Sequence, residues 1–183
     1  MLKKVVIALA AIVVIFVIVV VFQPADFRVE RTTTIAAPQA DVFAKVNDFH
    51  KWDAWSPWAK LDPDATITFD GPQSVQGTVM TWAGNNRVGE GKMTLTESQP
   101  NDLVKLKVDF VKPFEGTARQ EFALKPQGDQ TAVTWSMQGH NNSFIQKAFC
   151  LVMNGKKMIG DDLEKGLAQL KSVSETGKAA SNN

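Results

Sequence analysis

The stretch Ser143–Val173, SFIQKAFCLVMNGKKMIGDDLEKGLAQLKSV, decides the fold that we expect for this chain. Its apolar residues recur every three or four positions, which predicts one long amphipathic helix with a continuous buried stripe. Ser143 and Gln146 form a capping-box pattern at its start. Because a helix of this kind gains most of its stability from packing, the rest of the chain must cover its apolar stripe.

The chain before this helix has mostly the pattern of β-strands. Residues 27–35 alternate as a strand, and a short helix is expected at residues 38–46, starting at Pro38. Further strands are predicted at residues 65–70, 78–83, 87–97, 102–111, 117–125 and 130–138. A run of strands followed by a terminal helix indicates an α+β fold, in which a curved antiparallel sheet of about seven strands wraps around the long C-terminal helix.

The N-terminal segment predicts a membrane anchor. Residues 5–22 are apolar and uncharged, close to the shortest run that spans a bilayer. Lys3 and Lys4 precede the run, so the positive-inside rule predicts a cytoplasmic N-terminus and an extracytoplasmic, periplasmic domain. We expect residues 1–23 to form an uncleaved single-pass transmembrane helix in the inner membrane of the cell. The alternative is a cleaved secretory signal, whose apolar core is usually about 7–15 residues long.

The remaining organisation follows from composition. We expect one domain over residues 24–174 and a disordered tail over residues 175–183, where the residues become small and polar. The formal net charge of +1 gives no reason to expect nucleic acid as a partner. The single cysteine excludes an intramolecular disulfide. Tyrosine is absent while phenylalanine and tryptophan are frequent, which suits packing or an apolar cavity better than acid–base chemistry.

The aromatic residues provide the candidate site. Three of the five tryptophans lie in residues 49–58, a segment that predicts a short broken helix because Pro57 disfavours helix at Ser56. We expect an apolar cavity between the sheet and the C-terminal helix. The residues predicted to line it are Trp52, Trp55, Trp58, Trp82, Phe110, Phe122, Trp135, Met137, Phe149 and Met153. For each of them, an ordinary place in a packed core is the alternative.

Three stretches resemble the START-like superfamily, also called helix-grip or Bet v 1-like, and within it the bacterial SRPBCC group of polyketide cyclase/dehydrase and lipid transport proteins. They are residues 35–43 (IAAPQADVF), 47–58 (NDFHKWDAWSPW) and 158–167 (MIGDDLEKGL). The resemblance implies a seven-stranded sheet that grips the C-terminal helix and encloses an apolar cavity. Since the superfamily includes carriers, hormone and pigment binders and cyclases, the resemblance selects no single activity.

Few residues favour catalysis. His50 and His140 have no partner at the spacing of metal ligands, so neither a metal nor a cofactor is expected. Cys150 is interpreted as a small apolar residue of the helix. Charged pairs on the strands, Glu90 with Lys92 and Arg119 with Glu121, are expected to face solvent, whereas an enzyme would need such a pair inside the cavity.

The leading hypothesis is therefore a membrane-anchored protein that binds a lipid or other hydrophobic small molecule in an internal cavity. One alternative is a cyclase- or hydrolase-like enzyme on the same scaffold, which the shortage of catalytic side chains disfavours. Another is a non-catalytic interaction or stress module whose cavity is filled by side chains.

Overall fold

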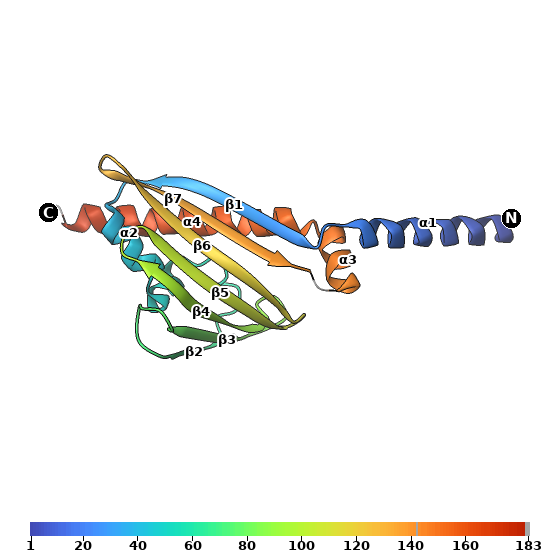
Figure 1. Ribbon diagram of the computed structural model, residues 1–183, viewed down its shortest axis with the longest axis horizontal. Helices are drawn as coiled ribbons and strands as arrows, with labels where there is room; N and C mark the ends of the chain where they lie inside the picture. Colours follow the sequence, from blue (N-terminus) through green and yellow to red (C-terminus); the bar gives the residue numbers. More distant parts are fainter. Residues whose placement is uncertain (142, 182–183) are drawn as a thin grey trace.

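The computed structural model describes residues 1–141 and 143–181. A seven-stranded antiparallel sheet, in the order β1-β7-β6-β5-β4-β3-β2, packs against one long C-terminal helix, α4 (Figure 1). This is the predicted fold. The strands are β1 (Asp26–Ile35), β2 (Thr66–Asp70), β3 (Val79–Ala83), β4 (Glu90–Gln99), β5 (Leu103–Lys112), β6 (Gly116–Gln127) and β7 (Gln130–His140). The helices are α1 (Leu2–Phe22), α2 (Gln39–Val46), the 3-10 helix η1 (Phe49–Ala54), α3 (Phe144–Val152) and α4 (Gly155–Ser181).

Alternation along the strands decides which side chains face α4. Val104, Leu106 and Val108 of β5 are buried, while Lys107 between them is exposed, as expected for a sheet with one wet face. The strand register places these residues in rows with inward-facing residues of β6 and β7, such as Phe122 opposite Trp135. We call this face of the sheet the helix side.

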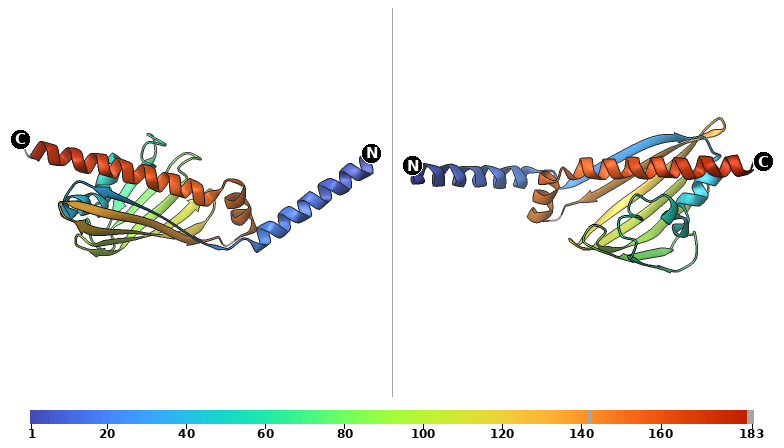
Figure 2. Two further views of the ribbon diagram at one scale, coloured as in Figure 1. Left: turned by 90° about the horizontal axis from the view of Figure 1, so that it is seen from above. Right: turned by 180° about the vertical axis from the view of Figure 1, so that it is seen from behind.

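Helix α4 packs mainly on β1 and also contacts β7, α2 and η1. Its leucines Leu163, Leu167 and Leu170 are buried at the spacing predicted for the stripe. Gly166 allows the helix to approach closely, because a Cβ there would lie 2.5 Å from the Trp135 ring. Figure 2 shows α4 running along one side of the sheet.

The C-terminal helical region differs from the prediction of one continuous helix. Helix α3 ends at Val152, and α4 begins at Gly155 in a different direction (Figure 1). Asn154 has a φ of 48°, a left-handed conformation that breaks the helix and that asparagine tolerates better than most residues. The predicted capping box is present at the start of α3, where Ser143 and Gln146 exchange hydrogen bonds. The Asn154-Gly155 pair is a helix-stop signal that periodicity alone does not reveal.

The end of α4 also differs from the prediction of a tail over residues 175–183. The helix continues to Ser181, and residues 182–183 lie outside the described part of the chain. Tertiary contacts account for the start of this extension: Glu175 accepts hydrogen bonds from Lys171 Nζ and from the backbone N–H of Ala36, both 2.7 Å long. These bonds hold the pKa of Glu175 below its usual range and connect α4 to the end of β1.

Helix α1 projects from the domain (Figure 1). Within the described residues, it is the one helix long and apolar enough to cross a membrane, and of its side chains only Val20 is buried. Three residues, Gln23 to Ala25, separate it from β1. The domain therefore starts immediately where this apolar helix ends.

Candidate ligand site

The predicted aromatic residues fall into three groups, and the first forms solid core. Trp52, Trp55, Phe122 and Trp135 are buried, with Phe122 and Trp135 stacked at a ring-centroid distance of 4.7 Å. Trp55 contacts both of these rings edge-on, at 5.9 and 5.7 Å. Trp58 is half-buried and packs edge-on to Trp135 at 5.7 Å. These rings pack against one another between sheet and helix at the α2 and η1 end.

Hydrogen bonds fix the indoles of this core in place. The Nε1 groups of Trp52 and Trp55 donate to the backbone carbonyls of Val46 and Lys45, at 2.8 and 3.2 Å. The buried Trp135 donates from Nε1 to Gln120 Oε1 at 3.0 Å. Because buried N–H groups are costly to leave unpaired, these bonds select one position for each ring. All three residues belong to the hydrophobic core.

The second group lies on the helix side near the other end of the sheet. Trp82 and Phe110 are half-buried, with ring centroids 6.1 Å apart in an edge-on arrangement. Gly91 lies between them in the strand register, and a Cβ there would come within 2.5 Å of the Trp82 ring. Met80 and Ile159 are also half-buried apolar residues packed against the core. The apolar helix side is therefore only partly covered at this end.

An open depression of about 690 Å³ lies at the end of β5 and shares Phe110 with this region. The turn between β5 and β6 and the start of α3 form its walls, and Phe110 belongs to its lining. Its other lining residues are Asp109, Val111, Pro113, Phe114, Glu115, Gly116, Thr117, Ser143 and Gln146. Of all the lining residues, only Phe110 is among the site residues predicted from the sequence. A kinked turn and a helix start carry no periodic signal that would indicate the others.

The third group consists of Phe149 and Met153, which the structure separates from the other predicted residues. Both are exposed, Phe149 on α3 and Met153 just after it. Phe149 packs instead against Phe114 of the β5–β6 turn, with ring centroids 5.6 Å apart. The separation follows from the helix break at Asn154. Met137, by contrast, is buried on the helix side of β7.

The polar candidates form no recognisable catalytic arrangement. His50 contacts Asp48 at 3.2 Å but stacks on exposed Phe69, and His140 contacts Asp26 at the surface. Burial raises the pKa of the Cys150 thiol, which disfavours the reactive thiolate. In the described part of the chain, no three His, Cys, Asp or Glu residues could together hold a metal ion.

The charged strand pairs lie outside the apolar region, as predicted. Lys92 and Arg119 are exposed, and Glu90 forms an ion pair with exposed Lys112 at 2.6 Å. A second depression of about 330 Å³ includes Lys105, Lys107 and Arg119 in its lining. Surface charges of this kind keep their solvation, so they offer no buried acid or base.

A strongly twisted sheet around a long helix, with apolar residues between them, defines a helix-grip protein. The family described as "Polyketide cyclase / dehydrase and lipid transport" matches residues 26–175. The chain belongs to this family, and its domain is therefore an SRPBCC-type ligand-binding scaffold. Comparison with curated proteins gave no significant match.

Solved structures share this fold at low sequence identity. A protein from Nitrosospira multiformis aligns with a TM-score of 0.61 and 17% identity, over 84% of this chain and 99% of the other. The Aha1 dimer from Colwellia psychrerythraea gives 0.55 and 21%, over 83% and 98%. The di-domain ARO/CYC StfQ of the steffimycin biosynthetic pathway gives 0.60 and 10%, over 85% and 52%. At such identities the similarity establishes the fold alone.

Proposed function

We propose that this protein is a membrane-anchored binding protein for a lipid or another hydrophobic small molecule. The observation that carries the proposal is the uneven closure of the helix side. Its α2 and η1 end is filled by packed aromatic rings, whereas Trp82, Phe110 and Ile159 stay half-buried toward the other end, where Phe110 also lines an open depression. Apolar surface removed from water contributes about 25 cal/mol per Å², so a ligand could bind there without a charged anchor.

The anchor in this proposal is α1, which crosses the inner membrane once and keeps the domain in the periplasm. Its support is the exposed apolar surface of α1 and the two lysines that precede the apolar run. A ligand that partitions into the bilayer would then be held at high local concentration near the site.

A pair of neighbouring β3 residues tests the ligand site. Trp82 and Thr81 point to opposite faces of the sheet. Native mass spectrometry of the full-length chain extracted from its host membrane should detect a bound apolar molecule in the wild type. Trp82→Arg should abolish this bound mass, because a guanidinium would be placed in the apolar region. Thr81→Arg, on the wet face, should retain it.

Circular dichroism of both variants provides the folding control. A wild-type chain without any bound molecule, or equal occupancy in a folded Trp82→Arg variant, would contradict the proposed site. Trp82→Phe keeps an apolar ring at this position, so this variant should retain the bound molecule that Trp82→Arg loses.

A further inference from the structure

Helix α3 presents an apolar face that the domain leaves uncovered. Phe144, Ile145, Phe149 and Val152 lie on one side of this helix, and Met153 follows it. All five are exposed, with Ile145 at 63% and Val152 at 68%. The helix has no fully buried residue, so packing within the domain does not explain its apolar face.

The β5–β6 turn extends this apolar surface. Val111 at the end of β5 and Phe114 in the turn are exposed, and Phe114 packs on Phe149. A hydrogen bond of 2.6 Å from Gln146 Nε2 to the backbone carbonyl of Glu115 also joins turn and helix. We call these residues the interfacial patch: Val111, Phe114, Phe144, Ile145, Phe149, Val152 and Met153.

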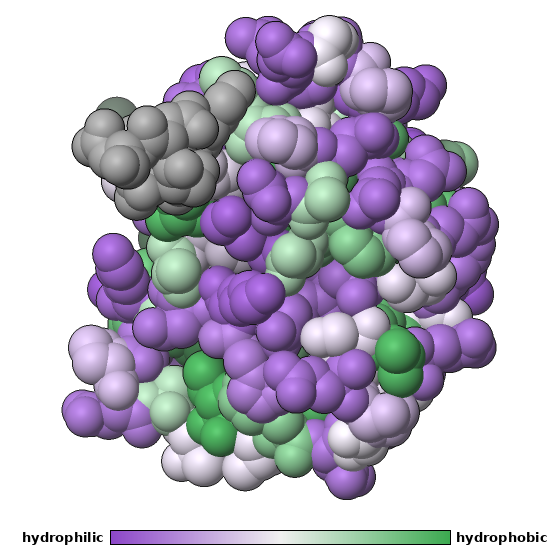
Figure 3. Space-filling view, turned by 90° about the vertical axis from the view of Figure 1, so that its left-hand side faces the viewer, coloured by the Kyte–Doolittle hydropathy of each residue, from purple (hydrophilic) through white to green (hydrophobic). Residues whose placement is uncertain are grey.

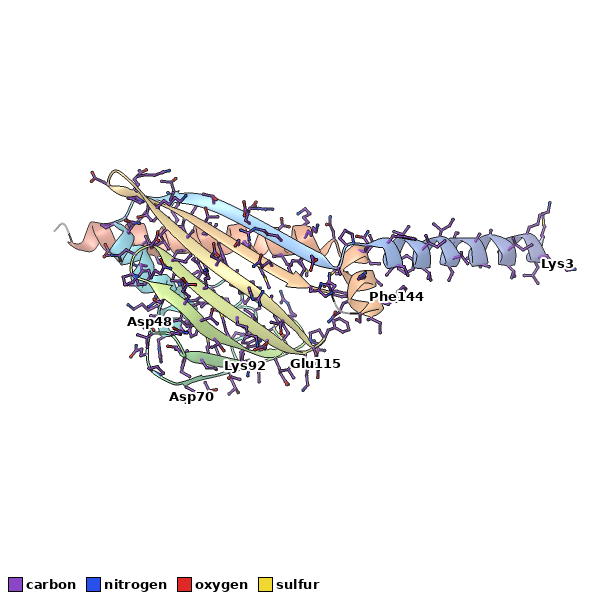
Figure 4. All side chains as sticks on the ribbon, viewed as in Figure 1. Lys3, Asp48, Asp70, Lys92, Glu115 and Phe144 are labelled. Atoms are coloured by element: carbon purple, nitrogen blue, oxygen red, sulfur yellow. The ribbon has the colours of Figure 1, made fainter. Side chains whose placement is uncertain are left out.

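The patch lies where α1 meets the domain. Helix α3 contacts α1 and lies crosswise to it (Figure 1). Figure 4 places Phe144 and Glu115 at the end of the domain from which α1 projects, with Lys3 at the far end of α1. The opposite end of the molecule is mainly hydrophilic, with scattered apolar residues (Figure 3). Exposed apolar residues thus gather at the end that carries the apolar helix.

The length of α1 and the short connection to β1 indicate what covers the interfacial patch. The 21 residues of α1 extend about 32 Å at 1.5 Å per residue, close to the thickness of a bilayer's hydrocarbon core. If α1 spans the bilayer, Phe22 therefore lies at its surface. The three residues before β1 can extend at most about 10 Å, so they cannot lift the domain away from the headgroups.

We propose that the interfacial patch is a membrane-docking surface, with α3 and the β5–β6 turn lying in the headgroup region of the bilayer that α1 spans. This inference rests on the membrane anchor of the proposed function. An amphipathic helix in the plane of the interface and an adjoining aromatic turn are typical of proteins that lie on a membrane. The depression between turn and helix would then open beside the lipid surface.

Spin labels in the full-length chain test this docking directly. In a Cys150→Ser background, nitroxide labels are attached at Ile145→Cys, Phe114→Cys and, as the exposed control on α4, Lys165→Cys. The chain is reconstituted in phosphatidylcholine/phosphatidylglycerol vesicles. Collision rates are measured with oxygen, which concentrates in the bilayer, and with a water-soluble nickel chelate. The oxygen-to-nickel ratio should be severalfold higher at positions 145 and 114 than at position 165.

A fourth label, at Val13→Cys inside α1, separates the docking surface from the anchor. A lipid-like ratio at position 13 with water-like ratios at 145 and 114 would overturn the docking surface and leave the anchor intact. A water-like ratio at position 13 would overturn the anchor and the docking surface together. Strong dipolar coupling between labels at position 145 of two chains would overturn membrane docking in favour of a second copy on the patch.

Discussion

Individual residues determine how much of the helix side stays open. Gly91 is the clearest case, because its missing side chain gives the Trp82 indole room to lie across β4 toward Phe110. A glycine in a strand often marks a place where another element approaches closely. The ring that occupies the space became evident only from the packing of neighbouring strands.

Gly91→Ala should therefore destabilise the domain. The added Cβ would lie 2.5 Å from Trp82 Cζ2 and 2.6 Å from the carbonyl oxygen of Asp109, so the ring or the strand must move. Overpacking of this kind costs about 1–3 kcal/mol. Denaturant unfolding of the full-length chain in detergent, followed by tryptophan fluorescence, measures the loss.

Gly116→Ala is the matched control for this change. It is also a strand glycine, but its added Cβ would meet Gln146 Nε2 at an ordinary 3.7 Å. Its unfolding free energy should stay within about 1 kcal/mol of the wild type. Equal losses in the two variants would mean that contact with Trp82 does not set the requirement at position 91.

At the scale of elements, the break between α3 and α4 lets the two helices point their apolar faces in different directions. Helix α4 buries its leucines against the core, while α3 turns away and exposes its apolar face beside α1. The apolar spacing continues across the break, so the hydrophobic pattern alone merges the two helices. The left-handed backbone at Asn154 redirects the chain.

Substitutions at Asn154 should follow the cost of that backbone conformation. Asn154→Gly should keep or raise stability, because glycine adopts positive φ without steric cost. Asn154→Val should be less stable than Asn154→Gly by about 1–2 kcal/mol, since a β-branched residue is strained at φ 48°. Denaturant unfolding in detergent compares the two variants. Identical stabilities would show that the break is held by other contacts.

At the scale of the whole molecule, polarity is divided between two ends. The apolar helix α1, the interfacial patch and the open depression lie at one end, and the filled indole core with α2 and η1 lies at the other (Figure 1). A carrier that exchanges an apolar ligand with a bilayer would need its opening on the side of the membrane. The arrangement is consistent with the proposed function for that reason.

Single-cysteine labelling tests the proposed topology in cells. In the Cys150→Ser background, Lys165→Cys should react with a membrane-impermeant maleimide in spheroplasts, because the proposed orientation puts the domain outside the cytoplasm. Leu2→Cys should react only after permeabilisation, and it leaves Lys3 and Lys4 in place for the positive-inside rule. The reverse labelling pattern would contradict the orientation. An intact mass that lacks residues 1–23 would show that α1 is a cleaved signal.

The sequence by itself determined the succession of seven strands before a C-terminal helical region, and the apolar run of α1. These features depend on repeats of two, three or four residues along one chain, and such repeats are visible in the sequence.

Only the tertiary structure decided which aromatic residues fill the core and which border open space. Trp135 lies in the filled part of the core because Trp55, Phe122 and Gly166 approach it from three different parts of the chain. No local pattern in the sequence indicates that these residues come together. The exposure of Phe149 likewise depends on a single left-handed residue and on the turn that meets α3. Packing is a property of volumes brought together by distant segments, whereas periodicity is a property of neighbours in the chain.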